Sequence, residues 1–136
     1  MEKQLLIGGY GLHKLGSSRG SKEIEYLVHD QSNNAFFIHD GKNYYNANGS
    51  QFFAEVWKME ENNIGEIASP QALLELVAYT FVQHCSNHFF QKADEAEFDI
   101  KFLVRSFNLE DLKIVTKYIT AAQHKEIKKI IKSVRK

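Results

Sequence analysis

Residues 5–28 read LLIGGYGLHKLGSSRGSKEIEYLV, and this stretch decides the fold that the sequence predicts. Gln4 to Ile7 is a short, mostly apolar run that indicates a buried strand ending at a pair of glycines. Tyr10 to Leu15 predicts a short helix that ends at Gly16. A polar loop then leads to a strand from Glu23 to Asp30, in which the side chains alternate between two faces.

Three more strands are expected in the first half of the chain, over Ala35 to His39, Lys42 to Asn46 and Gln51 to Met59. The dipeptides Asp40-Gly41 and Asn48-Gly49 separate them and tolerate the positive φ angles of tight hairpin turns. These strands are therefore expected to form an antiparallel meander.

Helical periodicity replaces strand patterns from Ser69 onward, where Ser69-Pro70 offers a hydroxyl cap followed by proline at the first helical position. Four helices are expected, over Ser69 to about His88, 96–107, 109–119 with Asn108 as its cap, and 127–134. The sequence thus predicts a single α+β (α/β-like) domain over residues 1–136. Its sheet-rich half is 1–64 and its helical half 69–136, with helices packed on one side of a small mixed sheet.

The composition suits one globular domain, since 136 residues include 43% hydrophobic residues and a single proline. The longest mostly apolar stretch, Leu73 to Val82, is interrupted by Glu75 and is far shorter than the roughly 20 residues of a spanning helix. No basic, apolar leader precedes Leu5, so export is not expected. Cys85 is the only cysteine, which excludes an internal disulfide and suits a cytoplasmic location.

Charge is unevenly distributed along a chain whose net charge is zero. Lys125 to Lys136 carries six basic side chains and one acidic one, net +5, which leaves net −5 on Met1 to His124. Such a basic terminal helix can attract nucleic acid or an anionic partner. The alternative is a solvated helix face, because lysines in a last turn also suit the helix dipole.

The glycine pair and two nearby carboxylates suggest a chemistry. Backbone amides beside Gly8 and Gly9, at the start of a helix, can approach phosphate oxygens closely. Glu23 and Glu25 lie two apart on a predicted strand, so both face one side, where they can share divalent metal ions that bridge phosphates. These parts suit a nucleoside triphosphate. Alternatively, the glycines form a simple turn and the two glutamates are solvated.

The order of these residues resembles the nucleotidyltransferase superfamily, the DNA polymerase β-like fold, and in particular its small bacterial and phage members related to abortive-infection toxins. Their pattern has an apolar residue, Gly, Gly or Ser, nine to thirteen residues, and then two acids that alternate with apolar residues. Here Gly8-Gly9 is followed by thirteen residues and then by Glu23-Ile24-Glu25-Tyr26. Arg19 and Ser21 fall where that subgroup has an Arg and a Ser or Thr. The resemblance covers roughly residues 5 to 104 and includes Ser69-Pro70, Lys92 and Asp99-Ile100.

This resemblance implies a set of site residues. The nucleotide-binding residues would be Gly8, Gly9, Ser17, Arg19 and Ser21, and the catalytic metal ligands would be Glu23, Glu25 and Glu55. The ligands would hold Mg²⁺ or Mn²⁺, and Arg19 would neutralise developing charge.

Two of these assignments concern glutamates. The superfamily normally has Asp-x-Asp, and each Glu here adds a methylene, so the carboxylates lie farther from the strand and hold a metal less rigidly. The superfamily's third acid lies on a neighbouring strand. Glu55 is the candidate because Phe53 and Trp57 flank it on one face of the expected strand, where a carboxylate needs a partner.

The function that the resemblance implies is transfer of a nucleoside monophosphate from a triphosphate to a hydroxyl on RNA or protein. Two metal ions would activate the acceptor oxygen and stabilise the leaving pyrophosphate. The alternative is a catalytically inactive module of the same fold. Such a module would bind a partner protein or RNA through the cleft or through the basic C-terminal helix.

Other combinations of residues point to chemistry less specifically. His84 and His88 are four apart on an expected helix, as two zinc ligands would be, but no third ligand is evident. Cys85 lies on the apolar stripe of that helix and is expected to be core. Paired aromatic residues could stack on RNA bases, but strands packed under helices need such residues anyway, so a place in the core is favoured: Phe36, Phe37, Tyr44, Tyr45, Phe52 and Phe53.

Overall fold

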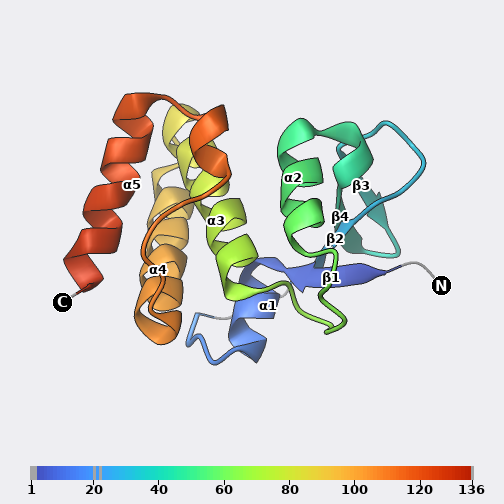
Figure 1. Ribbon diagram of the computed structural model, residues 1–136, viewed down its shortest axis with the longest axis horizontal. Helices are drawn as coiled ribbons and strands as arrows, with labels where there is room; N and C mark the ends of the chain where they lie inside the picture. Colours follow the sequence, from blue (N-terminus) through green and yellow to red (C-terminus); the bar gives the residue numbers. More distant parts are fainter. Residues whose placement is uncertain (1–2, 20, 22, 136) are drawn as a thin grey trace. The chain divides into compact units, whose positions relative to one another are not determined.

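The computed structural model describes residues 3–19, 21 and 23–135, and it confirms an α+β fold with a helical C-terminal half (Figure 1). The strands are β1 (Gln4–Ile7), β2 (Glu25–Val28), β3 (Phe36–His39) and β4 (Lys42–Asn46). The α-helices of the described residues are α1 (Gly8–Lys14), α2 (Gln51–Met59), α3 (Pro70–Ser86), α4 (Phe90–Phe107) and α5 (Ala121–Val134). Two short 3₁₀ helices are η1 (Ala47–Gly49) and η2 (Val115–Tyr118).

The chain divides into two compact units, the first ending at Ala72 and the second beginning at Leu73. The division lies close to the change from strand patterns to helical periodicity in the sequence. The first unit contains the sheet with α1 and α2, and the second contains most of α3 together with α4, η2 and α5.

The four strands form one mixed sheet in the order β1-β2-β4-β3. The β1 strand is antiparallel to β2, β2 is parallel to β4, and β3 is antiparallel to β4. The expected meander is therefore wrong, because β4 lies between β2 and β3. The buried side chain of Asn46 explains the crossover: it donates to the carbonyls of Ser32 and Asn34 and accepts from the amide of Asp30. It thereby ties the loop after β2 to the end of β4.

One of the two predicted hairpin turns is confirmed. Asp40 and Gly41 have φ angles of 52° and 72° and join β3 to β4. Asn48 and Gly49 instead belong to η1. A Cβ on Gly49 would lie 2.4 Å from the backbone nitrogen of Ala35, so this glycine permits two segments to approach closely.

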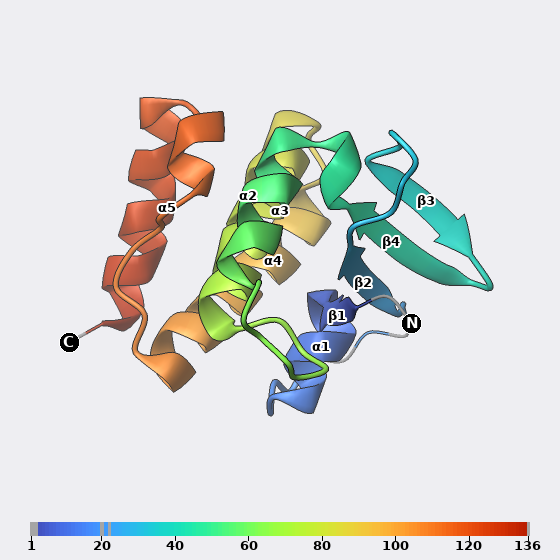
Figure 2. The ribbon, with the colours of Figure 1, turned by 45° about the vertical axis from the view of Figure 1, so that its right-hand side comes forward.

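The expected strand over residues 51–59 is also wrong, because these residues form α2. The Ser50 hydroxyl caps this helix by accepting from the amide of Phe53. Phe52 and Val56 are buried at a spacing of four while Ala54 is exposed, so the burial follows a helical period. The helix packs on β2 and β4 (Figure 2).

The helical unit confirms three of the four expected helices. The amide of Ala72 donates to the Ser69 hydroxyl at the start of α3, and Thr120 with Gln123 forms a capping box at the start of α5. The helix expected over 109–119 is wrong, since only η2 forms there. Asn108 has a φ angle of 53° and ends α4 instead of starting a helix.

A buried carboxylate accounts for the missing helix. Glu75 of α3 is fully buried and accepts hydrogen bonds from the amides of Lys113, Ile114 and Val115, at 2.7, 2.9 and 2.8 Å. These bonds fix the segment as a loop before η2.

Among the helices of the described residues, none has both the length and the apolar character of a membrane-spanning helix.

Candidate functional site

The candidate site begins where β1 passes directly into α1. Ile7 pairs with Glu25 across the antiparallel strands, and Gly8 follows with a φ angle of 72°. A Cβ built on Gly8 would lie only 2.1 Å from Oε1 of Glu25. The positive φ angle therefore favours glycine here, and any side chain would also have to displace the Glu25 carboxylate.

The second glycine brings in the polar loop. A Cβ on Gly9 would lie 2.7 Å from Cβ of Ser21 and 3.0 Å from a guanidinium nitrogen of Arg19. The loop that follows α1 thus folds back over the start of this helix. The structure therefore brings Gly8, Gly9, Arg19, Ser21 and Glu25 to one place, as the sequence predicts.

Two serines shape this loop. The buried Ser17 hydroxyl accepts from the amide of Arg19 at 3.3 Å, and the Ser21 hydroxyl accepts from the amide of Glu23 at 3.2 Å. Both contacts are local turns of the kind in which serine replaces a backbone acceptor. Ser17 thus has a role in placing Arg19.

Hydrogen bonds and burial set the state of the Glu25 carboxylate. The Tyr45 hydroxyl donates to its Oε2 at 2.8 Å, and Asn43, its partner in the β2/β4 register, also hydrogen-bonds to it. Burial raises the pKa of Glu25 above its ordinary value, and the negative charge of Glu23 adds to this. The hydrogen bonds and the positive charge of Arg19 act in the opposite direction.

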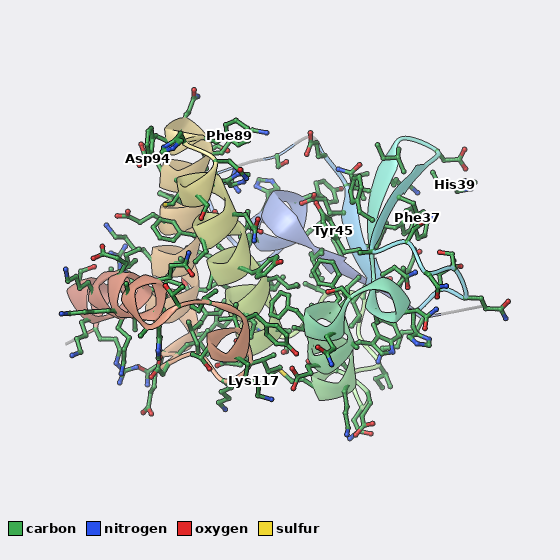
Figure 3. The ribbon with its side chains drawn as sticks, turned by 90° about the horizontal axis from the view of Figure 1, so that it is seen from above. Phe37, His39, Tyr45, Phe89, Asp94 and Lys117 are labelled. Carbon is green, nitrogen blue, oxygen red and sulfur yellow. The ribbon has the colours of Figure 1, made fainter. Side chains whose placement is uncertain are left out.

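Tyr45 belongs to an aromatic cluster that fixes its ring. The centroid of the Tyr45 ring lies 5.2 Å from that of the Phe36 ring and 5.6 Å from that of the Phe53 ring on α2. Figure 3 labels Tyr45 together with Phe37 and His39, two residues of β3. Burial and the adjacent Glu25 carboxylate raise the pKa of the Tyr45 phenol, so it stays protonated and donates to Glu25.

Glu23 and Glu55 do not lie on strands, although the sequence predicts strands for both. The strand begins at Glu25, so Glu23 precedes it and is exposed, although its charge still acts on Glu25. Glu55 lies on helix α2 and not on a strand, so the reason for choosing it as the third acid is wrong. The strand next to β2 presents Asn43 and Tyr45 to Glu25 instead.

The donor set limits how a divalent cation could bind. In residues 3–19, 21 and 23–135, no group of three His, Cys, Asp or Glu side chains is placed to hold a metal ion. Mg²⁺ commonly takes only one or two carboxylates and completes its shell with water and substrate phosphates. Glu23 and Glu25 would supply the two carboxylates of such a site, whereas the described residues form no all-protein cage.

The other candidate residues of the sequence do not form a site. His88 lies beyond the end of α3 with a φ angle of 60°, so it no longer shares a helical face with His84. Burial raises the pKa of the Cys85 thiol, which disfavours a reactive thiolate. Tyr26, Tyr44 and Phe37 stack on one another across three strands, with centroids 5.7 and 5.0 Å apart.

Sequence reasoning missed Tyr45 and Asn43 as site residues. Tyr45 was one aromatic residue among many in its strand, and nothing in the local pattern sets it apart. Their contact with Glu25 depends on the parallel pairing of β2 with β4, which the expected meander excluded. Since every residue of β4 is polar or a tyrosine, no signal in the sequence singles out 43 and 45.

Comparisons with protein-family models, with curated proteins and with solved structures found no significant match to this chain.

Proposed function

We propose that this chain is a nucleotidyltransferase that binds a nucleoside triphosphate at the start of α1 and transfers the nucleoside monophosphate to a hydroxyl on RNA or protein. One observation carries the proposal: β1, α1 and the following loop bring Gly8, Gly9, Arg19, Ser21 and Glu25 together. Their order and spacing are those of the superfamily that the sequence resembles.

The glycines and Arg19 would bind the phosphates. Two adjacent residues without side chains let Glu25, Ser21 and Arg19 lie directly against the backbone at the start of α1, so a phosphate bound there would meet these side chains. The Arg19 guanidinium lies beside Gly9, where it can neutralise phosphate charge. Ser17 and Ser21 hold the loop that carries Arg19, and Ser21 is close enough to Gly9 to contact the same ligand.

The acids would hold a cation. Glu23 and Glu25 would bind Mg²⁺ or Mn²⁺ together with the triphosphate, whereas Glu55, on helix α2, no longer has a reason to be proposed as the third acid. When bound, the ion would supply charge neutralisation at the phosphates. Tyr45 and Asn43 orient the Glu25 carboxylate from the neighbouring strand.

A labelling experiment tests the proposal. The protein is incubated with each α-labelled triphosphate, Mg²⁺ or Mn²⁺, and either total RNA or cell lysate. We expect label to become covalently attached to RNA or protein, and Glu25→Gln to reduce it by about tenfold or more, because the variant removes the half-buried carboxylate of the site. Glu61→Gln is the matched control, since it removes an exposed carboxylate of the same unit. Absence of label, or equal label from Glu25→Gln, would contradict the proposal.

The second candidate is an inactive module of the same fold that binds a partner protein or RNA. It is favoured by the neutral residues Asn43 and Tyr45, which face Glu25 from the strand where a further acid is expected. Under this alternative the labelling experiment gives no product, whereas RNA or a protein partner still binds.

A further inference from the structure

The C-terminal helix α5 packs through its apolar face. Ile127 is fully buried and Ile131 is 2% exposed, whereas Ile130 and Val134 are partly exposed, and α5 packs against α4 within the helical unit. The capping box of Thr120 and Gln123 fixes where the helix begins. From residue 125 to the end of α5, all exposed side chains are polar or charged.

Four lysines occupy that accessible face. Lys125, Lys128, Lys129 and Lys132 are all exposed, and their spacing of i, i+3, i+4 and i+7 places them on one face of the helix, opposite Ile127 and Ile131. We call these four residues the lysine face. At 1.5 Å rise per residue it extends over roughly 10 Å.

Acidic neighbours compensate the lysine face only weakly. Lys129 lies 3.2 Å from Glu126, with side chains 65% and 63% exposed, and Lys128 lies 3.8 Å from Asp111. Exposed ion pairs of this kind contribute little to the free energy of folding. Like charges at i, i+4 repel, as Lys125 with Lys129 and Lys128 with Lys132 do here. A polyanionic partner would relieve this repulsion.

We propose that the lysine face of α5 is an RNA-binding surface that contacts backbone phosphates. A membrane surface fits less well, because an interfacial helix needs an exposed apolar face and that of α5 is buried at Ile127 and Ile131. Residues 1–124 carry a net charge of −5, which repels a polyanion from the rest of the chain and favours contact at α5. The choice of RNA over DNA rests on the proposed function, which uses an acceptor hydroxyl.

The test measures binding of a fluorescent single-stranded RNA by anisotropy, over salt concentrations from about 50 to 200 mM. The variant changes all four lysines of the lysine face to Gln. A matched control changes four exposed lysines elsewhere, Lys14, Lys58, Lys92 and Lys113, to Gln, so that both proteins have the same net charge. The same sequence as DNA and vesicles of anionic lipid form two further arms.

We expect wild type and the control to bind RNA, and the lysine-face variant to bind about tenfold or more weakly at low salt. Its slope of log affinity against log salt should be shallower by roughly 3, at about 0.7 per lost phosphate contact. Equal affinity of the two variants, or no RNA binding by wild type at low salt, would overturn the proposal. Tighter binding to the DNA or to the vesicles than to RNA would also overturn it.

Triphosphate binding, followed in the same proteins, separates this proposal from the proposed function. The lysine-face variant should bind triphosphate as wild type does, because none of the four lysines is among the residues proposed to bind the nucleotide. Loss of RNA binding with retained triphosphate binding supports the lysine face specifically. Failure of triphosphate binding in wild type would contradict the proposed function and leave the RNA result to be judged on its own.

Discussion

At Gly8 a side chain would collide with the Glu25 carboxylate of the candidate site. Gly8 and Gly41 share a φ angle of 72°, but a Cβ would meet Glu25 only at Gly8, since nothing lies within 4 Å of that position at Gly41. Both alanine variants carry the strain of the left-handed conformation, of order 1 kcal/mol. We expect Gly8→Ala to lower the free energy of unfolding by at least about 1 kcal/mol more than Gly41→Ala, because Glu25 must also move.

Chemical denaturation of the two variants measures this difference. Adding Glu25→Ala should relieve much of the extra loss in Gly8→Ala and none of the loss in Gly41→Ala. Equal losses in the two single variants would mean that Glu25 does not lie against Gly8.

Glu25 makes stability depend on pH in a definite direction. Burial raises its pKa in the folded protein above the ordinary value of 4.5, so the folded state binds this proton more tightly than the unfolded state. The contribution of Glu25 to the free energy of unfolding is therefore largest below pH 4.5 and falls as the pH rises through the raised pKa.

The comparison of wild type with Glu25→Gln isolates this contribution, because the variant cannot ionise at residue 25. Denaturation between about pH 4 and pH 8 should show the wild type losing stability relative to Glu25→Gln as the pH rises. Glu61→Gln, which changes an exposed side chain, should show no such trend. A difference that is constant with pH would contradict the raised pKa.

At the scale of elements, Glu75 decides the conformation of residues 113–115. Its carboxylate accepts from three backbone amides while fully buried. Glu75→Gln has one acceptor oxygen and places an NH₂ group near those amides, so we expect a loss of about 1–3 kcal/mol in the free energy of unfolding. Hydrogen exchange at the amides of residues 113–115 should accelerate.

The matched control for this prediction is Glu97→Gln on α4. Glu97 forms a half-exposed i, i+4 pair with Lys101 at 3.0 Å, which is worth about 0–1 kcal/mol. A loss in Glu75→Gln no larger than in Glu97→Gln would show that the carboxylate does not hold the loop.

Elements formed by neighbouring residues could be predicted from the sequence, and those set by distant contacts could not. The Gly8-Gly9 pair and the Asp40-Gly41 turn are local, and β1, α1 and the hairpin followed from them. The helix prediction for residues 109–119 was wrong because Glu75, far away in the sequence, accepts hydrogen bonds from amides of this segment. The strand prediction for residues 51–59 was wrong because strand alternation and a helical period both fit Phe52 and Val56. The caps at Asn46 and Ser50 favour the helix.

At the scale of the whole molecule, the two compact units carry opposite charge. Residues 1–72 have six basic and nine acidic side chains, net −3, and residues 73–136 have the compensating +3. The candidate nucleotide site lies in the acidic unit, where Arg19 and a cation would offset the repulsion of a triphosphate. The lysine face lies in the basic unit. The sequence predicts an uneven charge but divides it elsewhere, with net −5 up to His124 and net +5 from Lys125 onward.

The most direct test of the central claim is a crystal structure of the protein with Mn²⁺ and each non-hydrolysable triphosphate analogue in turn. The account predicts phosphate density over Gly8 and Gly9 within hydrogen-bonding distance of Arg19, and an anomalous manganese peak beside the Glu25 carboxylate. A nucleotide bound elsewhere on the chain, or a site around Gly8 and Glu25 that stays empty at saturating concentrations of all four analogues, would contradict it.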